Sequence, residues 1–556
     1  MKMIEAQDYN CYEFMRAATV QYEPEYGDFR AANHMGKDLK RSEFFDDIES
    51  FTAYLQLQLK LKRGDCISIV CPTNVESLVG FYSANRLGVI TNFVHPLLPT
   101  EQIEELIVQS KSKAVMILDI LVKDHIKMLN KLGLPVILCR CSDYASPLKK
   151  IAAGTGETIL EAILPKIDHC STYWSILHDY RGKRAKVLER NGSDIAAYLN
   201  GGGTTGKAKT IKMTGHAMNA EIEMLGYIDE IKIPGEEAEI IILPFFHAFG
   251  LVTATHMALC NAACVIPLMR YDSKLVVKLY KKYKVVGLMG IPNMFKKLKN
   301  AEGFDGPHLA DTRMMFVGGD DCSPAFMEGF NDMLDKNGTK ARLRQGYGLT
   351  EVCAVCCVNT NWVNKDGSIG KPLHGIRMEC WDDNCKQVPT GEVGEICISG
   401  PTIMDGYLTD TGEEHAGLYF DEEGTAWVRS GDLGYVDEDG FFYFAGRKKR
   451  LIIISGYNVY PVDIENLIDK LPYVMESCAI KGTTDQGKPF VKLYVSLKKD
   501  GDEEKYKEEI IQLCKDNLDQ FSVPRAVEFR KDLPHTPLEK VDFMALQKEE
   551  DEKNKN

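Results

Sequence analysis

Short apolar runs alternate with longer amphipathic stretches over the first two thirds of the chain. These runs of Val, Ile, Leu and Met are bounded by Gly, Pro or Asp, and the stretches between them are long enough for crossover helices. They include "CISIV" (66–70), "AVMIL" (114–118), "VILC" (136–139), "EIIIL" (239–243), "VVGLMG" (285–290) and "MMFV" (314–317). Ahead of the second run, Ile103, Leu106 and Ile107 follow helical spacing, with Thr100 as the expected N-cap. The alternation predicts parallel strands joined by helices, which is an α/β fold.

The pattern changes after about residue 370, where short strands and turn signals follow one another. In "YVDEDGFFYFAG" (435–446) the pair Asp439-Gly440 lies between alternating apolar runs and predicts a hairpin. From about residue 450 the pattern is mixed again and predicts a small α+β domain. Its expected elements are a helix from Pro461 to Leu471, strands at 476–482 and 492–498, and a charged helix from Asp502 to Leu518.

Composition and charge narrow the class of protein. A chain of 556 residues with 44% hydrophobic and 26% charged residues is expected to fold into two or more globular domains. The net charge of −13 argues against general affinity for nucleic acid. No apolar stretch is long enough for a membrane span and no secretory leader is recognised, so the expected location is the cytoplasm. The charged ending "QKEEDEKNKN" is expected to be disordered.

The cysteines favour reduced thiols. There are seventeen, an odd number scattered along the chain without the spacing of a disulfide framework. The cluster "CAVCC" contains one C-x-x-C, but no second pair of cysteines or histidines stands near it in the sequence. We therefore expect Cys353, Cys356 and Cys357 to be small buried side chains rather than ligands of a metal.

The segment "LNGGGTTGKAKT" (199–210) has the composition of an anion-binding loop. Glycines allow backbone amides to point at an anion, and the threonines and lysines add donors and charge. Gly201, Gly206 and Lys207 begin a Walker motif, but Ala208 stands where that motif needs a hydroxyl for magnesium. The segment alone leaves two interpretations open, a phosphate loop of another kind and a surface loop rich in glycine.

Three further segments resemble ligand loops at strand ends, where open α/β sheets bind their substrates. In "PFFHAFG" (244–250), His247 follows an apolar strand and faces either a pocket or the core. In "QGYGLTE" (345–351), Tyr347 offers a stacking face, Thr350 a hydroxyl and Glu351 a carboxylate suited to magnesium. Near "RSGDLGY", Asp432 can accept two sugar hydroxyls while Arg447 supplies a cation.

The order and spacing of these segments resemble the adenylate-forming superfamily (AMP-dependent synthetases and ligases), of the acyl-CoA synthetase type. The similarity extends from "GDCISIVCPTNVE" to "LPHTPLEKVDF", nearly the whole chain. It implies an α/β fold with a large N-terminal domain of two doubly wound α/β subdomains plus a small β-barrel-like subdomain, followed by a small mobile α+β C-terminal domain. The implied boundaries are 1–446 for the adenylation domain, 447–545 for the C-terminal domain with a hinge near Lys449, and 546–556 for the charged tail.

The resemblance also implies the reaction and the roles of individual residues. An acid and ATP form an acyl-adenylate and pyrophosphate, with Mg²⁺ as cofactor, and the thiol of coenzyme A then takes the acyl group. The implied phosphate-loop residues are Thr204, Thr205, Gly206 and Lys209. The implied adenine-site residues are Gly319, Asp320, Gly346, Tyr347 and Gly348, and the ribose contacts are Asp432 and Arg447. Thr350 is implied near the α-phosphate, Glu351 as the magnesium ligand, and Lys540 as the catalytic cation between acid and phosphate. Gly456 and Tyr457 are implied in the thiol channel after rotation of the C-terminal domain.

Several features leave the substrate and the acceptor open. His247 is a candidate catalytic residue. It lies among phenylalanines and, with the run from Leu288 to Phe295, predicts an apolar pocket suited to a fatty or aryl acid. Gly202-Gly203, Ala208 and Thr210 depart from the residues usual in the family, which lowers the expected ATP affinity. Glu539 replaces a usual glycine and adds a carboxylate beside Lys540, but we still expect activity. Three hypotheses remain: an acyl-CoA synthetase, an enzyme that transfers the acyl group to a carrier-protein phosphopantetheine, and a ligand-binding relative without turnover.

Overall fold

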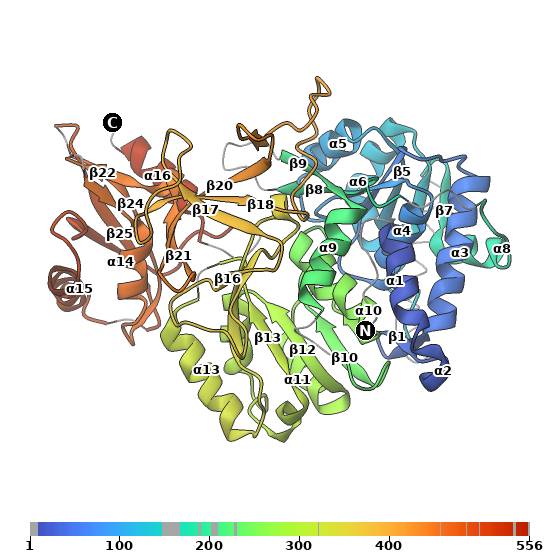
Figure 1. Ribbon diagram of the computed structural model, residues 1–556, viewed down its shortest axis with the longest axis horizontal. Helices are drawn as coiled ribbons and strands as arrows, with labels where there is room; N and C mark the ends of the chain where they lie inside the picture. Colours follow the sequence, from blue (N-terminus) through green and yellow to red (C-terminus); the bar gives the residue numbers. More distant parts are fainter. Residues whose placement is uncertain are drawn as a thin grey trace.

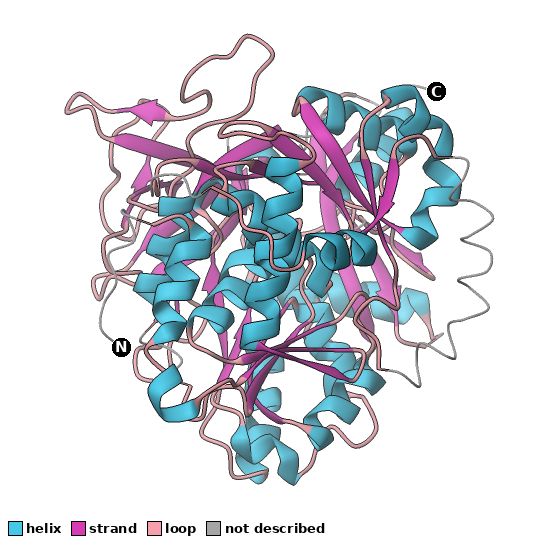
Figure 2. Ribbon diagram, turned by 90° about the vertical axis from the view of Figure 1, so that its right-hand side faces the viewer, coloured by secondary structure: helices cyan, strands magenta, loops and turns pink. Residues whose placement is uncertain are grey.

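The computed structural model describes residues 9–146, 167–186, 191–201, 209–226, 231–320, 322–455, 457–484, 486–499, 501–536 and 541–553. Figure 1 shows three parts: two helix-covered sheets in blue to yellow-green, an antiparallel sheet in yellow to orange, and a C-terminal domain in orange to red. In the view turned by 90° (Figure 2), strands lie between groups of helices. The expected α/β fold with a small C-terminal α+β domain is confirmed.

The first α/β subdomain is built on a seven-stranded sheet in the order β7-β6-β5-β3-β4-β8-β9. All its neighbouring strands are parallel except β9, which runs antiparallel to β8. The strands are β3 (Cys66–Val70), β4 (Ile90–Phe93), β5 (Ser112–Leu118), β6 (Val136–Cys139), β7 (Cys170–Thr172), β8 (Ile195–Gly201) and β9 (Lys209–Thr214). The helices are α1 (Cys11–Val20), α2 (Glu23–Tyr26), α3 (Arg41–Leu57), α4 (Val75–Arg86), α5 (Thr100–Gln109), α6 (Asp119–Leu132), α8 (Tyr173–Tyr180) and α9 (Gly215–Leu225).

The second subdomain contains a nine-stranded sheet in the order β16-β15-β14-β13-β12-β10-β11-β1-β2. Its strands are β1 (Arg30–His34), β2 (Lys37–Lys40), β10 (Glu237–Ile241), β11 (Cys264–Pro267), β12 (Lys284–Gly290), β13 (Met314–Val317), β14 (Leu343–Tyr347), β15 (Cys357–Val358) and β16 (Lys371–Pro372). Its helices are η3 (Phe249–His256), α10 (Met257–Cys260), α11 (Ser273–Lys282), α12 (Pro292–Lys299), η4 (Pro307–Asp311), α13 (Pro324–Lys336) and η5 (Thr350–Val352). Buried side chains from both sheets form one continuous hydrophobic cluster, so the two subdomains are packed together.

The β-rich part expected after residue 370 is a five-stranded antiparallel sheet. Its strands are β17 (Arg377–Trp381), β18 (Gly394–Ser399), β19 (Tyr419–Phe420), β20 (Ala426–Val436) and β21 (Phe442–Arg447). β20 and β21 form the predicted hairpin, and Gly440 has φ +81°, a value that favours glycine. This hairpin carries both Asp432 and Arg447 into the site.

The C-terminal domain has its own hydrophobic cluster around a three-stranded sheet, β24-β25-β26. Its elements are η6 (Lys448–Arg450), β22 (Ile452–Ile454), β23 (Tyr457–Val459), α14 (Pro461–Ile468), β24 (Val474–Thr483), β25 (Pro489–Leu497), α15 (Glu503–Asn517), β26 (Ala526–Arg530) and α16 (Phe543–Lys553). The helix expected from Pro461 to Leu471 ends three residues earlier, because Pro472 disfavours a helical conformation in the residue before it.

The expectation of a disordered tail is wrong for residues 547–553. They belong to α16, in which Leu546 is fully buried. Glu549 pairs with Arg530 at 2.6 Å and Glu550 with Lys492 at 2.7 Å, so the charges that suggested disorder hold the helix on the sheet. A second local correction concerns Thr100, which is the first residue of α5 rather than its cap. Its hydroxyl lies 2.9 Å from His125 Nδ1.

Two expectations about side chains agree with the structure. All seventeen cysteines are free thiols, and Cys353, Cys356 and Cys357 are buried.

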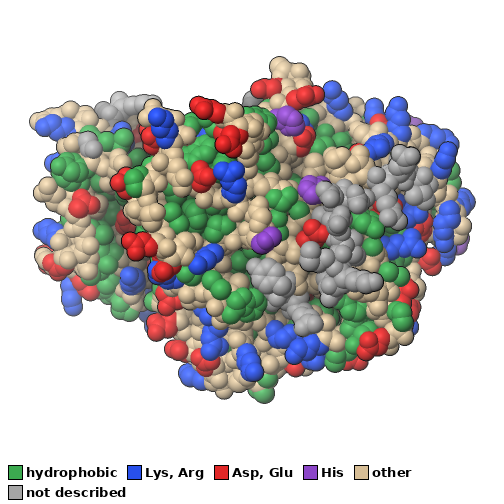
Figure 3. Space-filling view, in the orientation of Figure 1, with side chains coloured by type: hydrophobic (Ala, Val, Ile, Leu, Met, Phe, Trp, Pro, Cys, Tyr) green, Lys and Arg blue, Asp and Glu red, His purple; other side chains and the backbone are tan. Residues whose placement is uncertain are grey.

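On the face shown in Figure 3, Lys and Arg side chains are interspersed with Asp and Glu. Among the helices of the described ranges, none has the length and apolar character needed to cross a lipid bilayer.

Candidate active site

A cleft of about 3110 Å³ separates the large domain from the C-terminal domain. Its lining comes from the carboxyl ends of strands β10, β12, β13 and β14, from the hairpin β20–β21, and from α14 and the residues around α16. A cleft beyond the carboxyl ends of parallel strands is where open α/β sheets bind ligands. Its volume exceeds that of ordinary single-ligand pockets, which leaves room for two substrates.

The predicted ribose contacts and Tyr347 form one group, joined by a hydrogen bond and an ion pair. The Tyr347 hydroxyl donates to Asp432 Oδ2 at 2.8 Å, and Arg447 pairs with Asp432 Oδ1 at 2.8 Å. Asp432 is 2% exposed, whereas half of the Arg447 side chain is exposed. Burial and the Asp432 carboxylate hold the pKa of Tyr347 well above its ordinary value, so the phenol stays protonated and remains a donor.

Of the two glycines beside Tyr347, Gly348 is required by close packing. A Cβ on Gly348 would lie 1.5 Å from the carbonyl oxygen of Ala354, and Gly346 pairs with Val358 across β14 and β15. The loop that packs behind them contains Cys353 at φ +71° and Ala354 at φ +134°. Gly348 therefore lets a strained loop lie directly against the end of β14, the strand predicted to border the nucleotide.

Thr350 and Glu351 begin the short helix η5 at the cleft. Glu351 Oε1 accepts a hydrogen bond from the Tyr407 hydroxyl at 2.9 Å. The ammonium of Lys209 lies 4.5 Å from the centre of the Tyr407 ring, a cation–π distance. Tyr407 thus links the predicted magnesium ligand to a predicted phosphate-loop lysine. Sequence reasoning did not single it out, although the Gly-Tyr pair in "MDGYL" (404–408) was a visible signal.

The central residues of the phosphate loop, including Thr204, Thr205 and Gly206, lie outside the described residues. The strands on either side are paired, with Gly201 opposite Lys209, so the loop connects a two-stranded hairpin. Thr210, one of the departures from the family, is 2% exposed and donates to Asn200 Oδ1 at 2.7 Å. Its hydroxyl therefore joins β8 to β9.

Residues 405–408, in the connection between β18 and β19, hold β9 in place. The Leu408 amide donates to the Thr210 carbonyl at 2.8 Å, and the Lys212 amide donates to the Gly406 carbonyl at 3.0 Å. Lys212 also pairs with Asp405 at 3.2 Å. These contacts place Tyr407 between the hairpin and η5.

Gly319 and Asp320 follow β13 at the edge of the cleft. Gly319 has φ +78°, and Asp320 is exposed. The charge of Asp320 acts on Arg450 and Glu465 of the C-terminal domain. Asp320 lines the cleft. Its contact with adenine remains a prediction.

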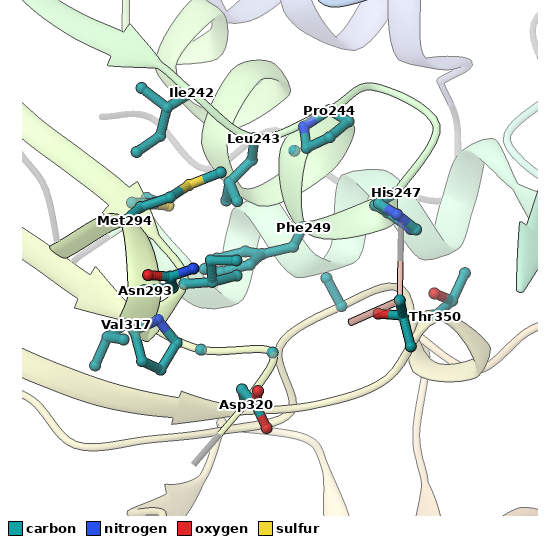
Figure 4. Close-up of a pocket in the computed structure, with 18 of the residues that line it drawn as sticks. Ile242, Leu243, Pro244, His247, Phe249, Asn293, Met294, Val317, Asp320 and Thr350 are labelled. Carbon is teal, nitrogen blue, oxygen red and sulfur yellow. The ribbon is translucent and has the colours of Figure 1, made fainter. Parts of the chain in front are cut away.

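His247 lies at the junction between the nucleotide side and an apolar pocket. Figure 4 shows His247 and Thr350 on facing sides of one space, with Ile242, Leu243, Phe249 and Met294 grouped beside it. The ring of Phe246 contacts both His247, at a centroid distance of 4.9 Å, and His95, at 4.2 Å. Burial lowers the pKa of His95, so this edge of the pocket carries no added positive charge at neutral pH.

The C-terminal domain presents one of its faces to the cleft. Thr536 and Val541 line it, while residues 537–540, including Lys540, lie outside the described residues. Val541 forms a β-bridge with His535, so the described residues on the two sides of this segment are paired. Gly456 also lies outside the described residues. Tyr457 does not line the cleft: it is 59% exposed and its ring stacks on Phe521 at 4.2 Å.

The oxygen donors of the site fit a magnesium ion held jointly with phosphates. Tyr407 occupies one oxygen of Glu351, which leaves the other for a cation, and the Thr350 hydroxyl is adjacent in the chain. Over the described ranges, no group of three His, Cys, Asp or Glu side chains is arranged to hold a metal without help. Mg²⁺ is commonly bound through one or two carboxylates together with substrate phosphates.

Comparisons with known proteins agree with this geometry. A family model described as AMP-binding enzyme matches residues 21–408, and one described as AMP-binding enzyme C-terminal domain matches residues 463–540. A long-chain-fatty-acid–CoA ligase of Escherichia coli O6:H1 is 29% identical over 93% of this chain and 91% of its own length. A long-chain-fatty-acid–CoA ligase of Bacillus subtilis is 28% identical over 95% of this chain and 93% of its own length.

Solved structures share the fold. ATP-bound MatB from Rhodopseudomonas palustris superposes with a TM-score of 0.78 at 22% identity, covering 97% of this chain and 99% of that one. The anthranilate CoA ligase AuaEII in complex with anthranoyl-AMP gives a TM-score of 0.80 at 17% identity, covering 98% of each chain. With most of its length matched by the family model, the chain belongs to the AMP-binding enzyme family.

Proposed function

We propose that this protein is an ATP-dependent, AMP-forming fatty acid–CoA ligase. The observation that carries the proposal is the direct junction between an apolar pocket and a polar group built from Thr350, Glu351 and Tyr407. A carboxylate at the mouth of that pocket faces the part of the cleft where the nucleotide residues converge. Relatives at 26–29% identity are named long-chain-fatty-acid–CoA ligases, which supports the same reaction class.

In the first step a carboxylate oxygen of the acid attacks the α-phosphorus of ATP. The bond between that phosphorus and the bridging oxygen breaks, and pyrophosphate leaves with the electron pair. Lys540 is proposed to offset the repulsion between the carboxylate and the phosphate, since cations placed where negative charge meets lower the barrier. Thr204, Thr205, Gly206 and Lys209 are proposed to hold the outer phosphates. Mg²⁺, when bound at Glu351, supplies further positive charge to the phosphate oxygens.

The nucleotide is held by the group around Asp432. The carboxylate, fixed by Tyr347 and Arg447, is proposed to accept the ribose hydroxyls, and the Tyr347 ring is proposed to stack on the adenine. In the second step the thiol sulfur of coenzyme A attacks the acyl carbon, the bond to AMP breaks, and the thiol proton passes to solvent. Because the face carrying Tyr457 lies away from the cleft, this step requires a rotation of the C-terminal domain, for which η6 and Lys449 are the proposed hinge.

Among hydrophobic acids, we favour a flexible long-chain acid over a flat aryl acid. Methionines recur along the lining of the cleft, at 257, 289, 294 and 314. Methionine side chains adapt to irregular or varied contents, which suits an aliphatic chain with many conformers. The named function of the bacterial relatives points the same way.

Cytoplasmic location is proposed with this function. The seventeen free cysteines are those of a chain kept in a reducing compartment, where ATP and coenzyme A are also found.

A panel of carboxylic acids scored by pyrophosphate release, with and without coenzyme A, tests the proposal. Long-chain fatty acids should release pyrophosphate faster than benzoates, and coenzyme A should increase turnover. Lys540→Ala should abolish acid-dependent pyrophosphate exchange and leave ATP binding largely intact. Lys548→Ala removes an exposed lysine of the same domain and is the matched control.

Two outcomes would overturn the proposal. Acyl transfer to a holo-carrier protein but not to coenzyme A would identify the carrier-dependent enzyme class instead. ATP binding without exchange for any acid, in the unmodified protein, would identify a ligand-binding relative without turnover.

A further inference from the structure

Glu221 is a carboxylic acid in the core of the large domain that the proposed mechanism does not use. It lies on α9, the helix that follows β9, and its side chain is fully buried. Carboxylates are almost never fully buried without a charged partner. Within the described part of the chain, the groups that hold Glu221 are a hydroxyl, a backbone amide and a thiol, and none of these is a cation.

Two elements of the cleft meet at this carboxyl group. One oxygen is hydrogen-bonded to the Thr253 hydroxyl of η3. The other accepts from the Val355 amide at 3.2 Å. Glu221 therefore connects η3 to the loop after η5, although neither is adjacent to α9 in the sequence.

The element on the first side, η3, is the wall of the apolar pocket. It is an eight-residue π-helix, and Phe249, Gly250 and Thr253 from it line the cleft. A π-helix is rare, because its wide turn is less stable than an α-helical one. The π-helices that do occur are frequently at functional sites. Gly250 packs so closely that a Cβ would lie 2.2 Å from the carbonyl oxygen of Pro244. A wall of this kind needs outside contacts to keep its shape.

The element on the second side, the loop containing Cys353, Ala354 and Val355, supports the nucleotide strand. Two of its residues have positive φ, and Ala354 packs against Gly348. At the end of the loop, the Cys356 amide donates to the Tyr347 carbonyl at 3.0 Å. Releasing Val355 would therefore loosen the backbone that carries Tyr347.

We propose that Glu221 is a positioning residue that fixes the wall of the acid pocket and the strand of the nucleotide site relative to one another. This inference rests on the proposed function of the cleft. Its consequence is that the two substrates depend on the same side chain, although it touches neither.

The carboxyl group acts in its neutral form. Burial raises the pKa of Glu221 to about 8. The titratable and charged groups on the elements packed around it do not reverse this. They are Cys11 of α1, His256 of η3, Cys260 of α10, Cys353 and Cys356 of the loop, and Lys212 of β9. The pKa values of these thiols are raised by burial, that of His256 is lowered to about 3, and Lys212 is paired with Asp405.

Steady-state kinetics of Glu221→Gln and Glu221→Ala test the proposal. The amide of glutamine can still accept from Val355 and donate to Thr253, so Glu221→Gln should keep both KM values within about twofold of wild type. Glu221→Ala should raise the KM for ATP and the KM for the acid together by about tenfold each, equivalent to 1.4 kcal/mol. A residue needed only for stability would lower the active fraction and leave both KM values unchanged.

Thr253→Val and the pH profile supply independent readouts. Thr253→Val should raise the KM for the acid, and combining it with Glu221→Ala should add little, because both changes remove the same contact. Above pH about 8, wild-type kcat/KM should fall as Glu221 ionises, whereas Glu221→Gln should lack this decline.

Glu49→Gln is the matched control, because Glu49 is buried, 7% exposed, but pairs with Tyr12 and Arg86 away from the cleft. If Glu221→Ala behaves like this control, or if only one of the two KM values moves, the inference is wrong. Failure of the proposed function would be seen separately, as absence of pyrophosphate release by the wild-type protein with every acid.

Discussion

Removing the Tyr347 hydroxyl tests one side-chain group of the proposed nucleotide site. In Tyr347→Phe the ring remains for the proposed stacking on adenine, while the hydroxyl's hydrogen bonds to Asp432, at 2.8 Å, and to Ser430 are lost. Arg447 still pairs with the Asp432 carboxylate, but half of the Arg447 side chain is exposed, so it orients the carboxylate less firmly than the buried phenol does. We expect weaker ATP binding because the ribose would meet an acceptor with more freedom.

The magnitude follows from the type of hydrogen bond. A hydrogen bond to a charged group contributes about 1.5–3 kcal/mol. The Kd for ATP should therefore rise by roughly 10- to 150-fold. Titration calorimetry with ATP in the absence of acid measures this directly, and the KM for ATP should rise by a similar factor while the KM for the acid changes little.

Tyr443→Phe is the control for this experiment. Tyr443 lies on the same hairpin and donates to another aspartate, Asp437, at 3.2 Å, outside the cleft. Its loss should leave ATP affinity unchanged. Equal affinities of Tyr347→Phe and wild type would refute the reasoning, since they would mean that Asp432 either does not meet the nucleotide or needs no second partner.

Three further predictions concern the metal position, the loop behind the nucleotide strand and the dependence of stability on pH. Tyr407→Phe should raise the Mg²⁺ concentration needed for half-maximal pyrophosphate release by about tenfold or more, because Glu351 loses a donor at 2.9 Å. Gly348→Ala should lower the thermal midpoint and abolish ATP binding, because the added methyl group would overlap the carbonyl of Ala354. The pKa of Glu221 is raised from 4.5 to about 8 in the folded protein, so its stabilising contribution is complete below pH 4.5 and is lost as the pH rises to 8. Urea unfolding at pH 5 and pH 8.5 should show that wild type loses about 4 kcal/mol more than Glu221→Gln over this interval. Equal losses would contradict the buried neutral carboxyl.

The local pattern of apolar and polar residues was enough to predict the strands that bury one or both of their faces. The runs from 66 to 70 and from 314 to 317 are strands β3 and β13, and the Asp439-Gly440 pair is a hairpin turn. These elements are specified by apolar periodicity and turn chemistry within a few residues. The tail was mispredicted for the complementary reason: its charges are satisfied by Arg530 and Lys492, which are distant in sequence.

The candidate site was predictable in part. Motif order indicated Tyr347, Asp432 and Arg447, and the structure brings them within hydrogen-bonding distance. Tyr407 and Glu221 were not singled out, because what distinguishes each is a contact across subdomains. A tyrosine in a glycine-rich segment or a glutamate in an amphipathic helix has no local signal of such a contact. Residues of this kind become visible only when the tertiary structure shows their partners.

The bridge between His535 and Val541 gives the carboxyl end of the chain an unexpected importance. The bridge joins the described residues on either side of the segment that contains Lys540, and α16 follows Val541 closely and is held on β25 and β26 by ion pairs. The terminal helix therefore anchors the residue that follows the proposed catalytic cation. If Lys540 acts as proposed, an affinity tag or fusion at this end should lower the rate of pyrophosphate release, and an expression tag is better attached elsewhere.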